Sequence, residues 1–494
     1  MPYDALSVAT LSVCACLLGA AATLRKSIAL RLGCILLAAL FLRADAAYQR
    51  SLHVWDESFH ALVAKNLIDA PLRPVLYRAP ALPYDSHDWM ANHVWLHKPP
   101  GALWLMAGSM RLFGANEVAL RIPSVLLSVL SVFLTFLIAR QLLTKEVALL
   151  AAAFQAVNGF LISLAAGRRV ADHVDTALIL FVELAVFLAI VFARSRRWPW
   201  LLLAGASVGA GLLTKTFPAL VAVPVAFACF TAVAGIRPAI LWTCAMVAGA
   251  ATVAGPWTLF IWNRFPIEAA AESSYTILHI SAVVEGQQTR WWTYLADLPR
   301  FFGELTPIGL GLGAAAVAAN ATRPEQRLLL VWLAVPYVVF SLVATRLPAY
   351  VMIAAPAIFI LLAAGVDRGR DLLPARGPGR AVGVAVLVLM VLLTGRFLLE
   401  PRGPMEKRDR SPSFARQLER LPERVGLADA VLFNVPKPID TMFYTRYTAY
   451  ERMPTESEVN EIRAAGRTVL IYQRNGAPVA VPAHWQVAEL HEER

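Results

Sequence analysis

The chain has 494 residues, of which 58% are hydrophobic, and a formal net charge of +11. Its mean hydropathy of +0.57 and its long apolar runs exclude an ordinary soluble domain and predict a polytopic membrane protein. The positive charge does not indicate nucleic-acid binding, because Arg and Lys cluster in short loops between apolar segments, where basic residues set membrane orientation.

A membrane-spanning helix needs about 17 to 25 mainly apolar residues, and the sequence contains about twelve such segments. They lie at residues 4–24, 28–47, 117–140, 147–166, 174–193, 198–213, 217–235, 239–261, 302–320, 327–345, 349–366 and 381–399. We expect the first to be a retained span, because no small-residue cleavage site and soluble domain follow it. The sequence therefore predicts an all-helical membrane domain.

Basic residues recur at every second loop, which predicts that those loops face the cytoplasm. They include Arg25, Lys26 and Arg31, then Arg140 and Lys145, Arg194 to Arg197, Arg237, Arg323 and Arg327, and Arg368 to Arg380. Both termini and the loops 48–116 and 262–301 then lie on the opposite side. In a bacterium, this places the protein in the inner (plasma) membrane with these loops facing the periplasm or the cell exterior.

Two regions outside the spans carry structure of their own. The loop 48–116 contains two apolar helical faces around a proline-rich stretch, which predicts interfacial helices. After Glu400, short β-like runs at 430–433, 468–472 and 485–490 flank a polar helix near 456–465. We therefore expect a membrane domain over 1–400 and a small soluble, extracytoplasmic α/β domain over 401–494.

The adjacent carboxylates Asp56 and Glu57 follow the second span. Such a pair at a membrane surface can bind a divalent cation or act as a general base, although it can also simply counter a helix dipole. Further along the same loop, two prolines follow Lys98 and can start a helix with the lysine at its N-terminal end, where an anion is favoured. That cation suits a departing phosphate, or it is a solvated lysine.

Five of the nine histidines lie between residues 53 and 97. His93 and His97 are four apart, a spacing that binds a metal ion on a helix, although the prolines after them weaken the helix assumption. A divalent metal ion is the one cofactor that the sequence points to. All five cysteines lie in apolar segments and suggest neither a disulfide nor a metal framework.

Several charged or aromatic residues fall at span ends on the predicted outer side. They are Arg169 and Asp175 at the start of one span, Lys215 at the end of another, Arg290 before Trp291 and Trp292, and Arg346 with Tyr350 in the run Arg-Leu-Pro-Ala-Tyr. Each alone also fits an interfacial anchor. Together with Asp56 they predict an outward-facing site.

Taken in order, these residues resemble the GT-C glycosyltransferases of the protein-mannosyltransferase superfamily, in particular the branch with the bacterial aminoarabinose transferase that modifies lipid A. The matching pieces are Asp56-Glu57, Lys98-Pro99-Pro100 with Trp104, Phe113-Gly114 with Glu117 and Arg121 to Ser124, Arg169 with Asp175, Thr214-Lys215, and Arg346 to Tyr350. The chain departs from the family at Gln287 and Arg290, where relatives often have His and Pro, at Arg346 for Lys, and at Thr216 for Gly. These departures bear on the sugar and the acceptor.

The resemblance implies a GT-C fold and inverting transfer of a sugar from a polyprenyl-phosphate donor to an extracytoplasmic acceptor, such as lipid A, another glycolipid or an envelope glycan. It implies catalysis by Asp56 and Glu57. It implies binding of the donor phosphate by Lys98, Lys215, Arg346 and Arg290, supported by Asp175, Arg169, Tyr350 and Trp104. The alternatives are a protein O-mannosyltransferase and, from another class, a lipid-linked sugar transporter or flippase. Membrane lipids are expected partners and nucleic acid is not.

Overall fold

The computed structural model describes residues 2–24, 27–168, 173–287, 289–374, 376–401, 403–474 and 481–490. The chain divides into two compact units. The helical unit comprises Met1–Ala47, Ser124–Arg264 and Ser273–Arg408, and the mixed unit comprises Tyr48–Pro123, Phe265–Glu272 and Asp409–Arg494. Two helices, α5 (Glu117–Leu142) and α12 (Pro266–Ser281), contribute residues to both.

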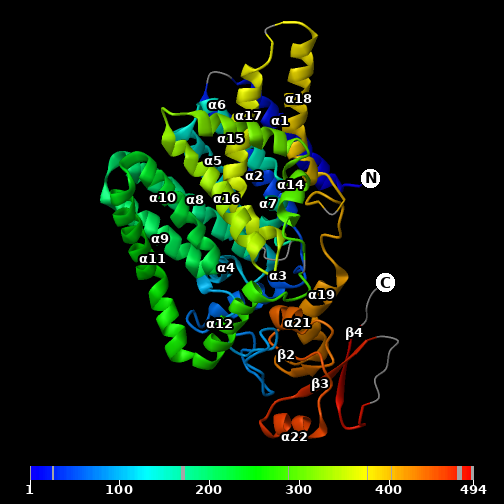
Figure 1. The fold of residues 1–494 in the computed structure, drawn as a ribbon. Helices are drawn as coiled ribbons and strands as arrows, with labels where there is room; N and C mark the ends of the chain where they lie inside the picture. The colour runs from blue at the N-terminus through cyan, green and yellow to red at the C-terminus, as the bar shows by residue number, and fades with distance from the viewer. Residues whose placement is uncertain are drawn as a thin grey trace. The chain divides into compact units, whose positions relative to one another are not determined.

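The helical unit consists of α-helices joined by short turns and 3-10 segments (Figure 1). Besides its parts of α5 and α12, they are α1 (Ala5–Thr23), α2 (Ile28–Ala47), α6 (Lys145–Val157), α7 (Gly159–Ala165), α8 (His173–Ser195), α9 (Trp198–Lys215), η1 (Phe217–Val221), α10 (Ala222–Ala234), α11 (Ile236–Arg264), α13 (Thr293–Ala296), α14 (Leu298–Phe302), α15 (Thr306–Ala319), η2 (Pro324–Arg327), α16 (Leu328–Leu342), η3 (Pro348–Ala354), α17 (Ala355–Asp371), α18 (Pro378–Thr394) and η4 (Arg396–Leu398).

Among the described residues, eight helices are long and apolar enough to cross a membrane, or up to ten if two bent pairs each count as one span. About twelve were predicted, and that number is not confirmed. For example, α2 is not among the eight, and it carries Arg31, Arg43 and Asp45 within its twenty residues. The prediction of a polytopic, helical membrane protein is confirmed.

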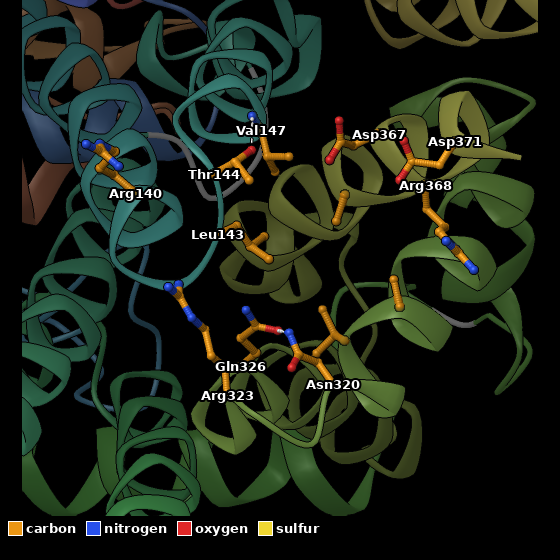
Figure 2. Close-up of a pocket in the computed structure, with 13 residues that line it drawn as sticks. Arg140, Leu143, Thr144, Val147, Asn320, Arg323, Gln326, Asp367, Arg368 and Asp371 are labelled. Atoms are coloured by element: carbon orange, nitrogen blue, oxygen red, sulfur yellow. Dashed lines mark hydrogen bonds between the residues drawn. The ribbon is translucent and has the colours of Figure 1, made fainter.

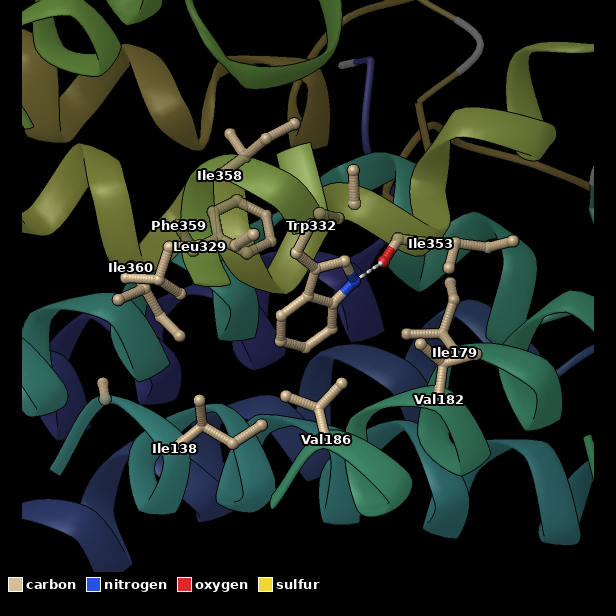
Figure 3. Packing of buried hydrophobic residues seen from close by; sticks show 14 of the residues in the cluster. Ile138, Ile179, Val182, Val186, Leu329, Trp332, Ile353, Ile358, Phe359 and Ile360 are labelled. Carbon is tan, nitrogen blue, oxygen red and sulfur yellow. Dashed lines mark hydrogen bonds between the residues drawn. The ribbon is translucent and has the colours of Figure 1, made fainter. Parts of the chain in front are cut away.

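The core of the helical unit lies where α5, α8, α16 and α17 pack together (Figure 3). Trp332 of α16 is fully buried, and its indole Nε1 donates a hydrogen bond of 2.9 Å to the carbonyl oxygen of Ile353. Phe359 of α17 and Val186 of α8 belong to the same buried cluster. A buried indole needs such a partner, so this bond fixes α16 against the segment that leads into α17.

Both bent helix pairs break at a residue whose chemistry explains the bend. The predicted span 147–166 is α6 plus α7, which meet at 59° at Asn158, whose side chain caps α7 by accepting from Leu161 N. A Cβ on the next residue, Gly159, would lie 2.6 Å from Leu398 N, so only glycine fits there. The predicted span 302–320 begins at a 100° bend around Gly303, whose φ is +99°.

A row of buried polar side chains runs along one face of α5. Its bonds run from Arg43 Nε to Ser128 Oγ (2.6 Å), from Gln155 Nε2 to Ser131 Oγ (2.6 Å) and from Thr135 Oγ1 to Glu183 Oε1 (2.7 Å). The α5 positions are three and four apart, so they share a face. Since polar groups inside a membrane protein are costly without partners, this row fixes the register of α2, α6 and α8 on α5.

The mixed unit combines a small parallel sheet with short helices. These are α3 (Asp56–Leu67), α4 (Pro100–Phe113), α19 (Ser413–Glu419), α20 (Leu421–Val425), β1 (Val431–Phe433), α21 (Pro438–Tyr444), β2 (Thr448–Ala449), α22 (Glu456–Ala464), β3 (Val469–Arg474) and β4 (Gln486–Leu490). The strand order is β2-β1-β3-β4, with Val431 paired to Thr448 and Val469, and Leu470 to Gln486. Buried Val431, Phe433, Val469 and Ile471 form its core.

The sequence predicted β1, β3, β4 and α22, and the small C-terminal sheet is confirmed. It also predicted the two helices in the first outer loop, which are α3 and α4. It missed β2 and α21, because two-residue and seven-residue elements carry too short a pattern. The predicted domain boundary at residue 400 stays a prediction. The mixed unit of the structure contains residues 48–123 in addition to the C-terminal segment.

Candidate active site

The first turn of α3 presents Asp56 from an unusual backbone bend. Trp55, the residue before the helix, has a φ of +69°, which a bulky residue rarely adopts. Its carbonyl oxygen accepts hydrogen bonds from the backbone N (3.0 Å) and the Oγ (2.8 Å) of Ser58, and these bonds hold the bend. Strained backbone held in this way is typical of functional sites. Asp56 is half-buried at the first position of the helix.

Its neighbour Glu57 is fully buried and bound on both oxygens by Arg121 of α5. The Arg121 Nε lies 2.7 Å from Oε1 and the Nη2 lies 2.8 Å from Oε2, and His53 N also donates to Oε2 at 2.5 Å. Arg121 further donates to the carbonyl oxygens of Gln49 and Ser51. A carboxylate engaged in this way is suited to holding α3 in place.

The C-terminal segment of the mixed unit contacts α3 through α21. The Lys65 Nζ donates to the carbonyl oxygens of Met442 (3.1 Å), Phe443 (2.5 Å) and Thr445 (3.0 Å), at the C-terminal end of α21. A cation is favoured there because the helix dipole is negative at that end. The helix that carries Asp56 is therefore held by α5 near its first turn and by α21 near its last.

Burial shifts the pKa of two side chains where α3 contacts α21. It raises the pKa of Asp440 on α21 to about 6, and Glu57 adds to the effect while Lys437 opposes it. Burial also lowers the pKa of Lys65 to about 8, aided by Arg78 and Arg446. Asp440 therefore changes charge between pH 5 and 7, whereas Lys65 stays mainly charged at neutral pH.

Lys98 and Trp104 lie at the start of α4, as predicted. Pro99 takes the capping position and Pro100 is the first helical residue, so the two prolines fix the half-buried Lys98 before the helix. The Trp104 Nε1 donates to the carbonyl oxygen of Pro71 at 2.7 Å, so this side chain ties α4 to the proline-rich loop.

The two histidines named as metal ligands do not lie on a helix, because Val94 between them forms an antiparallel bridge with Val75. His97 Nδ1 lies 2.6 Å from the Glu272 Oε1, and its ring stacks on Trp89 at 4.2 Å. His93 packs against Tyr84. No group of three or more His, Cys, Asp or Glu suited to a metal ion occurs within the described ranges.

The helical unit contains a second cluster, formed by Asp175, Lys215 and Tyr350. The Lys215 Nζ lies 2.7 Å and 2.8 Å from the two carboxylate oxygens of Asp175, with side-chain exposures of 13% and 2%. The ammonium also lies 5.2 Å from the centre of the Tyr350 ring. The start of α8, the end of α9 and η3 thus meet at one nearly buried cation.

The remaining predicted cations differ in their surroundings. The Arg346 guanidinium donates to the carbonyl oxygens of Thr289 (2.6 Å, from Nη1) and Ser341 (3.1 Å, from Nη2). Arg290 is exposed and its guanidinium lies 5.2 Å from the Trp292 ring centre. Arg169 lies outside the described residues.

Sequence reasoning gave no role to Arg121, Lys65 or Tyr444. Arg121 is a basic residue inside a predicted span, four positions after Glu117, and that placement was the available signal. Tyr444 donates to Glu117, and its hydroxyl accepts from Leu52 N at 3.2 Å, a long-range contact that leaves no local pattern.

Residues 97–262 match the family described as dolichyl-phosphate-mannose-protein mannosyltransferase. Among curated proteins, the chain is 30% identical over 293 residues to undecaprenyl phosphate-alpha-4-amino-4-deoxy-L-arabinose arabinosyl transferase 1 of Pseudomonas fluorescens, covering 54% of this chain and 48% of that protein. The corresponding transferase 2 of Proteus mirabilis is 25% identical over 366 residues, covering 69% and 60%. The chain spans about half the length of the first of these relatives.

Among solved structures, ArnT from Cupriavidus metallidurans bound to undecaprenyl phosphate matches with a TM-score of 0.62 at 16% identity, covering 88% of each chain. The chain therefore shares the fold of this protein. A second structural neighbour, an oligosaccharyltransferase from Archaeoglobus fulgidus, matches with a TM-score of 0.55 at 13% identity, covering 86% of this chain and 65% of that one. The predicted fold is thereby confirmed, and the long apolar helices indicate a membrane protein.

Proposed function

We propose that this protein is an inverting glycosyltransferase that moves a sugar from a polyprenyl-phosphate donor to a glycolipid acceptor, such as lipid A, or to an envelope glycan. In a single displacement, an acceptor hydroxyl attacks the anomeric carbon and the bond from that carbon to the phosphate oxygen breaks. The hydroxyl proton passes to a carboxylate, and polyprenyl phosphate leaves. The chain must therefore supply one base and several cations.

The observation that carries this proposal is the buried pair of Glu57 and Arg121, which holds α3 so that Asp56 stands at its first turn. Because both oxygens of Glu57 are bound, we assign the base to Asp56 and a positioning role to Glu57. The aminoarabinose transferases of Pseudomonas and Proteus support the reaction class by their names.

For the donor phosphate, we assign Lys215, Arg346 and Lys98, with Arg290 as a peripheral cation. Asp175 engages the Lys215 ammonium through two contacts, and no third hydrogen bond to this ammonium occurs in the described part of the chain. One of its three N–H groups is thus left for a phosphate oxygen. Asp175 and Tyr350 orient this cation rather than contact the sugar, and Trp104 supports α4.

The proposal also includes the location of the reaction, on the periplasmic or outer side of a bacterial inner membrane. A phosphatase reporter fused after Glu400 is expected to be active outside the cytoplasm, because the positive-inside pattern places this point on the outer side. A fluorescent cytoplasmic fusion at the same point would reverse the assignment.

The cellular test is mass spectrometry of lipids and surface glycans from cells with the wild-type protein, the Asp56→Asn variant or no protein. The wild type is expected to add one sugar mass to an envelope lipid, and Asp56→Asn is expected to match the cells without protein. Asp69→Asn is the matched control, since Asp69 is exposed and pairs with exposed Arg78. Sugar transfer that survives in Asp56→Asn would remove Asp56 as the base.

A protein acceptor is the second candidate, because the matched family is described as a protein mannosyltransferase. The same cells distinguish it: the added sugar would then appear on peptides and be missing from lipids.

A further inference from the structure

A charged hollow lies at one end of the helical unit, where α5 ends, α6 begins, α15 leads into η2 and α17 finishes (Figure 2). Its volume is about 490 Å³. The polar floor is formed by Gln326 and Asn320, whose side chains bond to each other at 3.0 Å, and Gln326 also donates to the carbonyl oxygen of Leu142. The proposed transfer reaction uses none of these residues.

The two aspartates that line the hollow lie together on one side of it. Arg140 and Arg323 lie on one side of it in Figure 2, and Asp367, Asp371 and Arg368 lie on the other. The two aspartates are four apart on α17, so they share a face of the helix. Arginines alone would follow from the positive-inside rule, but an acidic pair facing them does not.

These opposite charges do not pair with one another. Within the described residues, the side chains of Arg140, Asp367 and Asp371 form no hydrogen bond or salt bridge, and Arg323 reaches only the Leu142 carbonyl oxygen at 3.4 Å. Charges elsewhere at this end do pair: Arg194 lies 3.4 Å from Glu325, and Arg31 lies 2.8 Å from Glu146. The width of the hollow therefore keeps its charges apart, and a ligand with both charges would bridge them.

The position of the hollow points to the class of ligand. Asp371 ends α17, and the segment that precedes this helix contains Tyr350, whose ring lies beside Lys215. Seventeen helical residues span about 25 Å, and the apolar part of a bilayer is about 30 Å thick. If Lys215 lies at one membrane surface, the hollow lies at the headgroup level of the other.

We propose that this hollow binds a zwitterionic phospho-amine group, the chemistry of a phosphoethanolamine lipid headgroup. The guanidinium groups of Arg140 and Arg323 take the phosphate, and the carboxylates of Asp367 and Asp371 accept hydrogen bonds from the ammonium. A purely anionic headgroup would place its charge opposite the aspartates, and a trimethylammonium headgroup has no N–H to donate. This site is independent of the proposed transferase activity.

Native mass spectrometry of the full-length protein, released from detergent with added lipid, tests the proposal. The wild type is expected to retain a phosphatidylethanolamine at least about tenfold more strongly than phosphatidylglycerol or phosphatidylcholine, since each rival loses a charge-assisted contact. Soluble phosphoethanolamine, added as a competitor, identifies the source. If soluble phosphoethanolamine displaces phosphatidylethanolamine at equal concentration, the natural ligand is a free phospho-amine. If it does not, the natural ligand is the lipid. Both results support binding of a phospho-amine group in the hollow.

Paired variants locate the site. Asp367→Asn with Asp371→Asn is expected to abolish the preference for ethanolamine over glycerol headgroups, and Arg140→Gln with Arg323→Gln is expected to weaken retention of both lipids. Arg237→Gln, an exposed arginine outside the hollow, is the control and should retain the wild-type preference. Equal retention of the three lipids by the wild type, or an unchanged preference in the aspartate variant, would overturn the proposal.

Discussion

Removal of the Arg121 guanidinium tests how α3 is held. Arg121→Met keeps most of the side-chain volume but leaves the Glu57 carboxylate buried and without its partner, and both side chains are at most 1% exposed. Loss of one partner of a buried pair costs about 3–5 kcal/mol. The two bonds from Arg121 to the carbonyl oxygens of Gln49 and Ser51 disappear as well, so we expect a value toward the upper end of this range.

Chemical denaturation in detergent, followed by tryptophan fluorescence, measures this loss as a decrease in the free energy of unfolding. The double variant Glu57→Gln with Arg121→Met removes the stranded charge and is expected to recover at least about 2 kcal/mol of the loss. Arg111→Met is the control, because this exposed arginine makes a single side-chain hydrogen bond, of 3.4 Å, within the described residues. If Arg121→Met were as stable as Arg111→Met, or if the double variant recovered nothing, the positioning role of the pair would be refuted.

Two further predictions concern other buried acids. The pKa of Asp440, about 6, lies above the unfolded value, so its contribution to stability is fully present below pH 4 and is lost as the pH rises through 6. The free energy of unfolding should fall by about 2–3 kcal/mol over that window, and Asp440→Asn should flatten the profile; an unchanged profile would contradict this. In the polar row on α5, the Glu183→Gln side chain can still accept a hydrogen bond from Thr135 Oγ1, so this variant should stay near wild-type stability. Glu183→Leu cannot accept this bond and should lower the free energy of unfolding by about 1–3 kcal/mol. Equal stability of the two variants would show that the polar row does not stabilise the packing of these helices.

The sequence indicated the parts of this molecule whose signals are local. Apolar runs marked the spans, the prolines after Lys98 marked the start of α4, and short β-like runs marked β1, β3 and β4. Basic residues at alternate loops indicated an outer face, and Asp175 and Lys215, which were placed there by loop order alone, do form an ion pair.

Other features depend on contacts between distant segments and could not be predicted. The sequence placed Asp56 and Glu57 side by side as possible catalysts, but it could not show that Arg121, sixty-four positions away, binds Glu57. Similarly, His93 and His97 have a helical spacing, yet the bridge of Val94 to Val75 removes the helix. The bends at Asn158 and Gly303 reduce the number of simple spans, because a single polar or glycine residue interrupts an otherwise continuous apolar run.

The most direct test of the proposed function is a transfer assay with the purified protein in liposomes, an undecaprenyl-phosphate sugar labelled in the sugar, and a lipid A acceptor. The label is expected to appear on the acceptor with inverted anomeric configuration, matched mole for mole by free undecaprenyl phosphate. Asp56→Asn should reduce the rate by at least about 100-fold, the usual contribution of a general base. Label that crosses the bilayer while still attached to undecaprenyl phosphate, with no transfer to any acceptor, would contradict the account and indicate a transporter.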